Sequence, residues 1–235
     1  QPLASFLNKW LTEVVATTRR PNTLLCYTNQ IRLHVTPHLG NVPMTRIGPV
    51  QVQNLLSTLA AQNKSARQRQ LVRSILRRAM KQAVRWGCIP SNPVDGTDSP
   101  RVERRTLQVL NRDQANDLLV AARMSESQLY PLLMLAIGVG MRQGELLGLR
   151  WPDVNFDTGL VSIKGTLIEQ RGHLLGVQRP KSEAGVRQIP LPASVQTALR
   201  AHRNRVPEKC EWVFPCKNGT PHRKSSLTKQ FKALL

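Results

Sequence analysis

Arg142 and Glu145 are the residues in this sequence whose types and spacing best suit chemistry on an anion. The segment 129–153, LYPLLMLAIGVGMRQGELLGLRWPD, carries no charge up to Met141 and then places an arginine and a glutamate three residues apart. Burying a guanidinium alone costs several kcal/mol, so this arginine needs a carboxylate, a ligand phosphate or both. Glu145 falls on the same helical face and can hold the fork of Arg142 while leaving donors free for an anion.

The competing interpretation of this pair is a structural ion pair at a helix junction, which is the commoner meaning of an isolated R-x-x-E pattern. Gly138, Gly140 and Gly144 bracket the arginine. We therefore expect a sharp turn between two helices and close approach of another segment of the chain. Other features of the sequence decide between the two interpretations.

The charge of the chain predicts a polyanionic partner. Its 235 residues contain 34 Lys and Arg against 14 Asp and Glu, a formal charge of +20, far more than solubility requires. Aromatic residues make up 4% of the chain, which favours double-stranded DNA or another duplex backbone over stacked single strands. The acidic residues form no cluster of the kind that two-metal nucleases use, and we expect no cofactor or metal.

Cysteine usage and hydropathy argue against a disulfide-rich protein, a common zinc finger and a membrane-spanning protein. The four cysteines are widely scattered and match no disulfide framework, which fits a reducing compartment. A zinc site from Cys210, Cys216 and His222 would have a spacing that matches no common finger. The longest uncharged run is too short to span a bilayer, so we expect an intracellular protein with no membrane partner.

A basic ridge is predicted on a helix over residues 65–87. Ser65 and Gln68 form a capping-box pattern, and an apolar stripe runs from Val72 to Trp86 before Gly87. The segment 14–94 holds twelve Lys and Arg and no Asp or Glu, whereas a face built for solubility would mix signs. We define the basic ridge as the residues of this helix that we expect to bind DNA phosphates: Arg67, Arg69, Arg73, Arg77, Arg78, Lys81 and Arg85.

Periodicity and breakers predict a mainly α protein of two domains. Residues 1–90 form a helical domain with helices over 3–15, 22–36, 49–59 and 65–87, and Pro37 with Gly40 should end the second. Proline, glycine and other breakers mark a linker at 91–105. Residues 106–235 form an α+β domain with a small antiparallel sheet: a helix from Asn111, a hairpin over 154–163 extended by Leu167 and Ile168, a return strand over 186–191, and helices from Pro192 and Lys224.

Three motifs, in this order, resemble the tyrosine recombinase family of phage-type integrases over nearly all of the chain. The first is T-x3-Y-x3-I-x2-H-x2-P-x-L-G at Thr23–Gly40, which is similar to that family's core-binding domain. The second is G-x-R-x-x-E-L-x-x-L-x-W at Gly140–Trp151. The third is a lysine hairpin, P-K-S-x-x-G-x-R-x-I-P-L, at Pro180–Leu191. The proline-rich linker separates the first motif from the other two.

The resemblance implies site-specific DNA recombination through a 3'-phosphotyrosyl intermediate. By this resemblance, Arg142 binds the non-bridging oxygens of the scissile phosphate, Glu145 supports that arginine, and Lys181 protonates the leaving 5'-oxygen. These residue types fit, because a bidentate guanidinium neutralises equatorial oxygens without a metal. The family also implies a clamp on duplex DNA and a homo-tetramer on DNA for the full-length protein.

The sequence departs from the family's pattern in the residues that complete the active site. The family completes its site with a His-x-x-Arg box and a tyrosine nucleophile. Here Tyr27 falls in the predicted core, Tyr130 comes too early, and His222 has Ser225 where the box needs arginine. We therefore expect a fragment cut at both ends that binds DNA without cleaving it; the alternative is a non-catalytic DNA-binding or architectural protein of the same fold.

Overall fold

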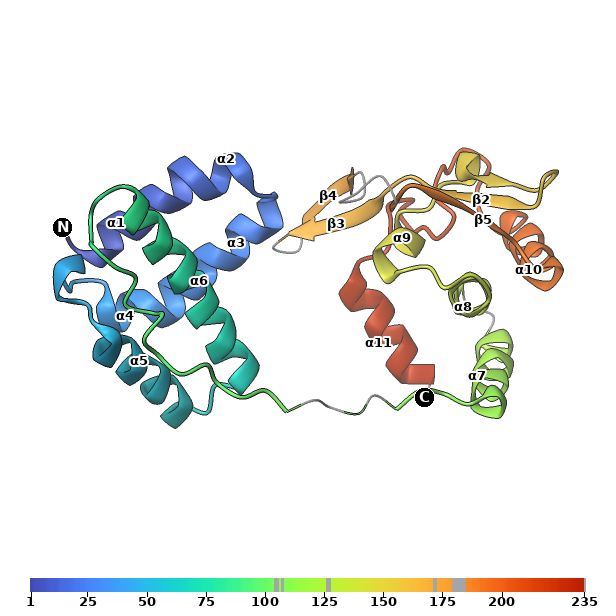
Figure 1. Cartoon of the computed structure of the whole chain (residues 1–235). Helices are drawn as coiled ribbons and strands as arrows, with labels where there is room; N and C mark the ends of the chain where they lie inside the picture. Colours follow the sequence, from blue (N-terminus) through green and yellow to red (C-terminus); the bar gives the residue numbers. More distant parts are fainter. Residues whose placement is uncertain (104–105, 107, 126–127, 171–172, 179–184, 235) are drawn as a thin grey trace. The chain divides into compact units, whose positions relative to one another are not determined.

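The chain forms two compact units, Gln1–Leu107 and Gln108–Leu235, each with its own hydrophobic core. Figure 1 shows it as a computed structural model, which describes residues 1–103, 106, 108–125, 128–170, 173–178 and 185–234. In these residues no helix is both long enough and apolar enough to cross a membrane. The predicted class is confirmed: a helical unit is followed by an α+β unit with small antiparallel sheets.

The first unit opens with two helical hairpin arms, each containing a π-type turn. The first arm is α1 (Leu3–Trp10), η1 (Leu11–Val15) and α2 (Ala16–Thr18); the second is α3 (Pro21–Gln30), η2 (Ile31–Val35) and α4 (Thr36–Leu39). We expected Pro37 to help end the second helix, and this is wrong. Pro37 instead occupies the first turn of α4, where a missing N–H costs no helical hydrogen bond, and the wider turn before it absorbs the irregularity.

Two further helices of this unit, α5 (Pro49–Ala61) and α6 (Ala66–Arg85), lie where the sequence predicted them. A short helix that was not predicted, η3 (Met44–Arg46), precedes them. Ser65 caps α6 by accepting from the Gln68 backbone at 3.2 Å, whereas the Gln68 side chain contacts Nε2 of His34 at 2.7 Å and forms no return cap. Trp86 is 38% exposed and meets Phe6 edge-on, so its predicted place in the core stripe is wrong.

The start of the predicted linker packs against the first unit. Residues 90–100 form no helix or strand, as their breakers indicated, but Ile89 and Val94 are buried in the core of the first unit. Arg73 of α6 donates to the carbonyl oxygen of Val94 at 3.1 Å and to that of Thr97 at 2.8 Å. This segment therefore completes the first unit up to Thr97.

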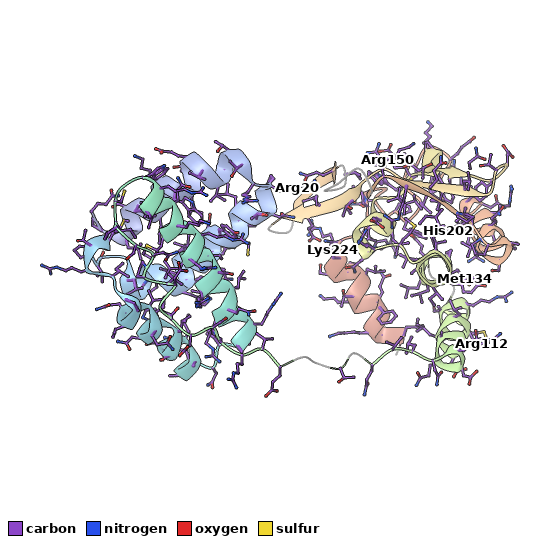
Figure 2. The ribbon with its side chains drawn as sticks, viewed as in Figure 1. Arg20, Arg112, Met134, Arg150, His202 and Lys224 are labelled. Carbon is purple, nitrogen blue, oxygen red and sulfur yellow. The ribbon has the colours of Figure 1, made fainter. Side chains whose placement is uncertain are left out.

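The second unit surrounds its sheets with helices. Its helices are α7 (Arg112–Met124), α8 (Leu129–Val139), α9 (Gln143–Leu147), η4 (Trp151–Asp153), α10 (Ala193–Arg203) and α11 (Lys224–Leu234). The helix predicted from Asn111 is α7, and Asn111 and Gln114 form a capping box at its start, with reciprocal hydrogen bonds of 2.8 and 3.0 Å. His202 of α10, labelled in Figure 2, is buried and contacts the Val213 carbonyl oxygen at 2.6 Å.

The described residues form two antiparallel sheets where the sequence predicted one. The first sheet has the order β1 (Val154–Asn155), β2 (Leu160–Ile163) and β5 (Arg187–Pro190), with Val161 opposite Ile189 and Ile163 opposite Arg187. The second pairs β3 (Thr166–Gln170) with β4 (His173–Gln178). We expected Leu167 and Ile168 to extend β2, and this is wrong. They lie in β3, which pairs with β4 and does not continue the first sheet.

Candidate functional site

Arg142 lies at a sharp junction between α8 and α9. Gly140 ends α8 in the left-handed region, with φ of 69°, a conformation that glycine adopts without steric cost. Arg142 is then the N-cap of α9. A Cβ atom on Gly144 would come within 2.5 Å of Cγ2 of Thr166, so α9 approaches β3 as closely as a glycine allows. Both the predicted turn and the predicted close approach are present.

Glu145 holds this junction from inside. One carboxylate oxygen accepts from the Arg142 backbone N–H at 3.0 Å, and the other accepts from a terminal nitrogen of its side chain at 3.0 Å. The Glu145 side chain is 3% exposed, against 75% for that of Arg142. The glutamate is therefore a buried support, and the guanidinium is presented to solvent.

A second arginine, Arg187, binds the same carboxylate. Its two terminal nitrogens donate to the two oxygens of Glu145 at 3.2 and 2.9 Å, a bidentate fork. We expected Glu145 to take the fork of Arg142, and this is wrong, because Arg187 occupies that geometry. Arg187 lies within the third motif, and the signal that could have found it is the need of a buried carboxylate for more donors than one exposed arginine provides.

The electrostatics of Glu145 follow from these contacts. Burial acts to raise the pKa of Glu145, but hydrogen bonds from Arg187, then from the backbone and side chain of Arg142, lower it below its usual range. The carboxylate is therefore ionised at neutral pH. One negative charge faces two guanidinium groups, so the cluster keeps an excess positive charge on its exposed side.

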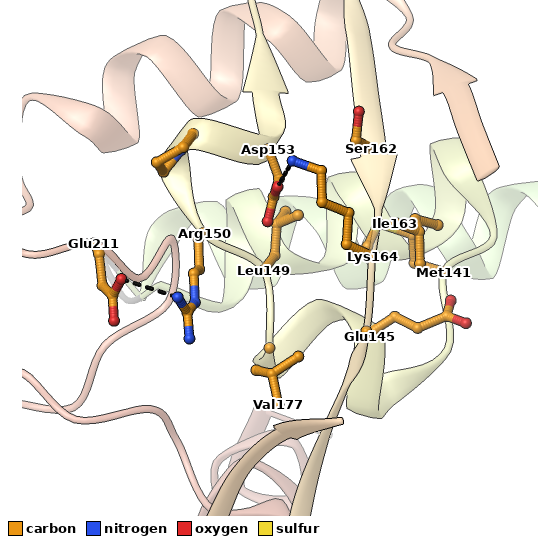
Figure 3. Close-up of a pocket in the computed structure, with 13 residues that line it drawn as sticks. Met141, Glu145, Leu149, Arg150, Asp153, Ser162, Ile163, Lys164, Val177 and Glu211 are labelled. Carbon is orange, nitrogen blue, oxygen red and sulfur yellow. Dashed lines mark ion pairs between the residues drawn. The ribbon is translucent and has the colours of Figure 1, made fainter. Parts of the chain in front are cut away.

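Beside Glu145 lies a pocket of about 380 Å³, which Figure 3 shows in close-up. Its cations are already paired: Lys164 with Asp153 at 2.6 Å and Arg150 with Glu211 at 3.2 Å, as the dashed lines mark. Arg142 is not among its lining residues. A phosphate site needs cations free to bind it, so the exposed side of Arg142 suits an anion better than this pocket does.

Lys181, the third residue predicted for the site, lies outside the described residues. The described part of the motif resumes before β5, whose first residue is Arg187. The structure therefore brings together Arg142 and Glu145 of the predicted set and adds Arg187 to them.

The basic ridge of α6 divides into two parts. Arg67, Arg77, Arg78, Lys81 and Arg85 are exposed, while Arg69 and Arg73 are half-buried. Five of the ridge residues form a row in which each is four residues from the next: Arg69, Arg73, Arg77, Lys81 and Arg85. Each step of four residues advances about 40° around a helix of 3.6 residues per turn, so this row winds from the edge of the core to the outer face. Arg69 and Arg73 stand at the buried end of this row.

Some ridge residues are also held by their own unit. Arg73 binds the 94–97 segment, Arg77 pairs with Asp95 at 2.5 Å, and Arg78 donates to the Tyr27 hydroxyl. Arg67, Lys81 and Arg85 are the other exposed cations of the ridge. We predicted one continuous phosphate-binding row, and the contacts of Arg73 make that part of it structural.

Each of the two tyrosines has contacts within its own unit. Tyr27 is buried in the first unit, where its ring stacks on Trp10 at 5.8 Å. Tyr130 lies under the guanidinium of Arg123 and lines a different pocket of about 770 Å³. Cys216 and Nδ1 of His222 meet at 3.4 Å, but the described residues hold no group of three or more metal-ligating side chains.

Two family models match this sequence. The one described as phage integrase, N-terminal SAM-like domain, matches residues 3–60. The one described as phage integrase family matches residues 108–235. A relative named tyrosine recombinase XerC-like, from Caldanaerobacter subterraneus subsp. tengcongensis, is 27% identical over 262 residues, which cover 99% of this chain and 66% of the relative. The chain thus spans just under two thirds of that protein.

Solved structures share the fold. The Tn1549 transposon integrase in complex with a circular intermediate DNA has a TM-score of 0.85 at 19% identity, covering 99% of this chain and 77% of that one. A lambda integrase tetramer bound to a Holliday junction has a TM-score of 0.77 at 21% identity, covering 100% of this chain and 65% of that one. At these identities the likeness is one of fold.

Proposed function

Because the chain belongs to the phage integrase family, we propose that it binds duplex DNA and carries part of the active site of a tyrosine site-specific recombinase. The observation that carries this proposal is the exposed Arg142 guanidinium, anchored from behind by the buried Glu145. A structural ion pair would bury both partners, whereas this one leaves most of the arginine's donors facing outward.

In the proposed chemistry, Arg142 binds the non-bridging oxygens of the scissile phosphate. Phosphoryl transfer concentrates charge on these oxygens, and a fixed guanidinium stabilises it without reorganising during the reaction. Glu145 keeps Arg142 in place. Lys181, by the family resemblance, delivers a proton to the leaving 5'-oxygen, a role that suits a flexible ammonium group.

The first unit supplies sequence-independent affinity for the DNA backbone. Its stretch from residue 14 to residue 94 has twelve basic and no acidic residues, and Arg67, Lys81 and Arg85 are exposed on α6. Lys and Arg that neutralise phosphates release counterions, so affinity should fall steeply with salt. For the whole protein, we propose strand exchange by a homo-tetramer on DNA, supported by the fold that the chain shares with the lambda integrase tetramer.

We also propose that these 235 residues bind DNA but do not cleave it. Cleavage by this chemistry needs an oxygen nucleophile in line with the phosphorus. Arg142 and Lys181 can stabilise charge and protonate a leaving group, but neither attacks phosphorus. Tyr27 is buried and bonded to Arg78, and Tyr130 lies beneath Arg123.

Salt-dependent affinity for a mixed-sequence duplex tests the DNA-binding part of this proposal. Changing Arg67, Lys81 and Arg85 together to Gln should make the negative slope of log K against log salt less steep. Its magnitude should fall by about 2 to 3, at roughly 0.9 per lost phosphate contact. The matched control changes the exposed Arg205, Lys209 and Lys217 of the second unit to Gln, the same loss of charge. An unchanged slope for the first variant, or an equal fall for both, would contradict binding by this face.

A further inference from the structure

Glu145 accepts as many hydrogen bonds as a carboxylate can, and Arg187 makes half of them. One oxygen accepts from Arg142 and Arg187 side chains at 3.0 and 3.2 Å; the other accepts from the Arg142 backbone at 3.0 Å and from Arg187 at 2.9 Å. A carboxylate has about four lone-pair positions. No position is left for a second nitrogen of Arg142.

The two arginines differ in what they have left to offer. The Arg187 side chain is 29% exposed and that of Arg142 is 75% exposed. Within the described residues, Arg142 uses one terminal nitrogen for its only side-chain acceptor, Glu145. Its Nε and its other terminal nitrogen remain, and these two form a fork that fits two phosphate oxygens.

Arg187 is fixed independently of this ion pair. It is the first residue of β5, paired with Ile163 of β2 in a regular antiparallel register. One of its terminal nitrogens also lies 3.4 Å from the Gly185 carbonyl oxygen. A side chain that starts from a sheet strand is well placed to hold a carboxylate on α9, 42 residues away in sequence.

We propose that Arg187 is a positioning residue: by occupying both oxygens of Glu145, it limits the Arg142 side chain to one hydrogen bond with Glu145 and leaves the Arg142 fork for a DNA phosphate. Without Arg187, a buried carboxylate would retain two unfilled acceptor positions and one nearby guanidinium. Arg142 would turn inward to fill them, because an unsatisfied buried charge is costly. This inference rests on the proposed role of Arg142 in the function above.

The test measures the salt dependence of duplex affinity for the 235-residue chain and its variants. Arg142→Ala removes the proposed phosphate contact and should lower the magnitude of the slope of log K against log salt by about 0.9. Arg187→Ala, which leaves Arg142 in place, should lower it equally, and the double variant should fall no further. The matched control is Arg200→Ala, which removes an arginine of α10 that donates to the Phe156 carbonyl oxygen instead; its slope should not change.

A suppressor separates positioning from a merely structural role. In the Arg187→Ala background, Glu145→Gln removes the charge that draws Arg142 inward, while a glutamine can still cap the Arg142 backbone. The slope should return to that of the unsubstituted chain. A purely structural Arg187 predicts no recovery. If Arg187→Ala shows no cooperative thermal transition, Arg187→Lys, which keeps the charge but not the fork, takes its place in both comparisons.

The outcomes distinguish this inference from the proposed function. An unchanged slope for Arg142→Ala would contradict the phosphate contact and the inference together. A fall for Arg142→Ala without one for Arg187→Ala, a further fall in the double variant, an equal fall for Arg200→Ala, or no recovery with Glu145→Gln would overturn the inference alone.

Discussion

Arg73 of helix α6 binds Thr97 twice, through Nε to the hydroxyl at 2.9 Å and through a terminal nitrogen to the carbonyl oxygen at 2.8 Å. The same terminal nitrogen lies 3.1 Å from the Val94 carbonyl oxygen. These contacts dock the segment after α6 onto the helix, and Val94 is fully buried there. Arg73 of the basic ridge is therefore a structural residue of the first unit.

Arg73→Ala should destabilise the first unit by about 1 to 3 kcal/mol, because it leaves two carbonyl oxygens and a hydroxyl without their charged donor. Chemical unfolding followed by circular dichroism measures this. Lys81→Ala removes an exposed cation of the same helix and should change the free energy of unfolding by less than about 0.5 kcal/mol. Equal stability of the two variants would show that the contacts of Arg73 with the 94–97 segment contribute nothing to the stability of the unit.

Gly144→Ala should destabilise the second unit by about 1 to 3 kcal/mol, the usual cost of overpacking. The new Cβ would lie 2.5 Å from Cγ2 of Thr166, and a β-branched side chain on a strand has little rotamer freedom to move away. Thr166→Ser deletes that methyl group. The double variant should therefore recover most of the stability lost in Gly144→Ala, as read from thermal unfolding; no recovery would place the strain elsewhere.

Local signals in the sequence predicted the elements that depend on neighbouring residues. Ser65 was identified as a helix cap, because a cap and its N–H partner are three residues apart, and Asn111 as the start of a helix; both residues cap their helices. The junction at Gly140 was likewise predicted from glycines around one arginine. Such features need no knowledge of the rest of the chain.

Contacts between distant segments were not predictable in the same way. The sequence of β3 did not show that β4 is its partner, because strand pairing depends on the rest of the fold. Arg187 reaches Glu145 across 42 residues, and Arg73 reaches Thr97 across 24. The motif contained Arg187, but its role depends on a carboxylate on another element.

Acidification below pH 6.5 should destabilise the second unit through His202. Burial lowers the pKa of His202 from its usual 6.5; the hydrogen bond to Val213 opposes this and the charge of Arg205 adds to it. The unfolded chain then binds a proton near pH 6.5 that the folded chain refuses, so stability is present above that pH and falls as pH drops toward the lowered pKa, by up to about 1.4 kcal/mol per pH unit.

His202→Gln keeps a donor for the Val213 carbonyl oxygen and removes the titration. The difference in the free energy of unfolding between pH 7.5 and lower pH should therefore shrink. Burial also lowers the pKa of His34 and of His222, so part of the pH dependence should remain. The unsubstituted chain, measured at the same pH values, is the reference. A pH profile identical in the variant and the unsubstituted chain would exclude His202 as a source.

The 235-residue chain should form no covalent adduct with DNA. A nicked duplex that traps a cleaved strand, built on the sequence that the chain itself selects from a random duplex pool, is the substrate to use. Binding should be retained, because the basic face of α6 and Arg142 remain, but no residue in this site supplies the attacking oxygen. Denaturing gels with and without magnesium should show free protein only, since the proposed chemistry uses no metal.

Tyr27→Phe and Tyr130→Phe are the matched variants for this experiment. Tyr27 lies in the core of the first unit and accepts a hydrogen bond from Arg78, and Tyr130 lines a pocket that does not include Arg142. Neither change should alter the absence of an adduct. An adduct that maps by mass spectrometry to Tyr27, Tyr130 or a serine would show that these residues contain a nucleophile, and the proposed division between DNA binding and cleavage would be wrong.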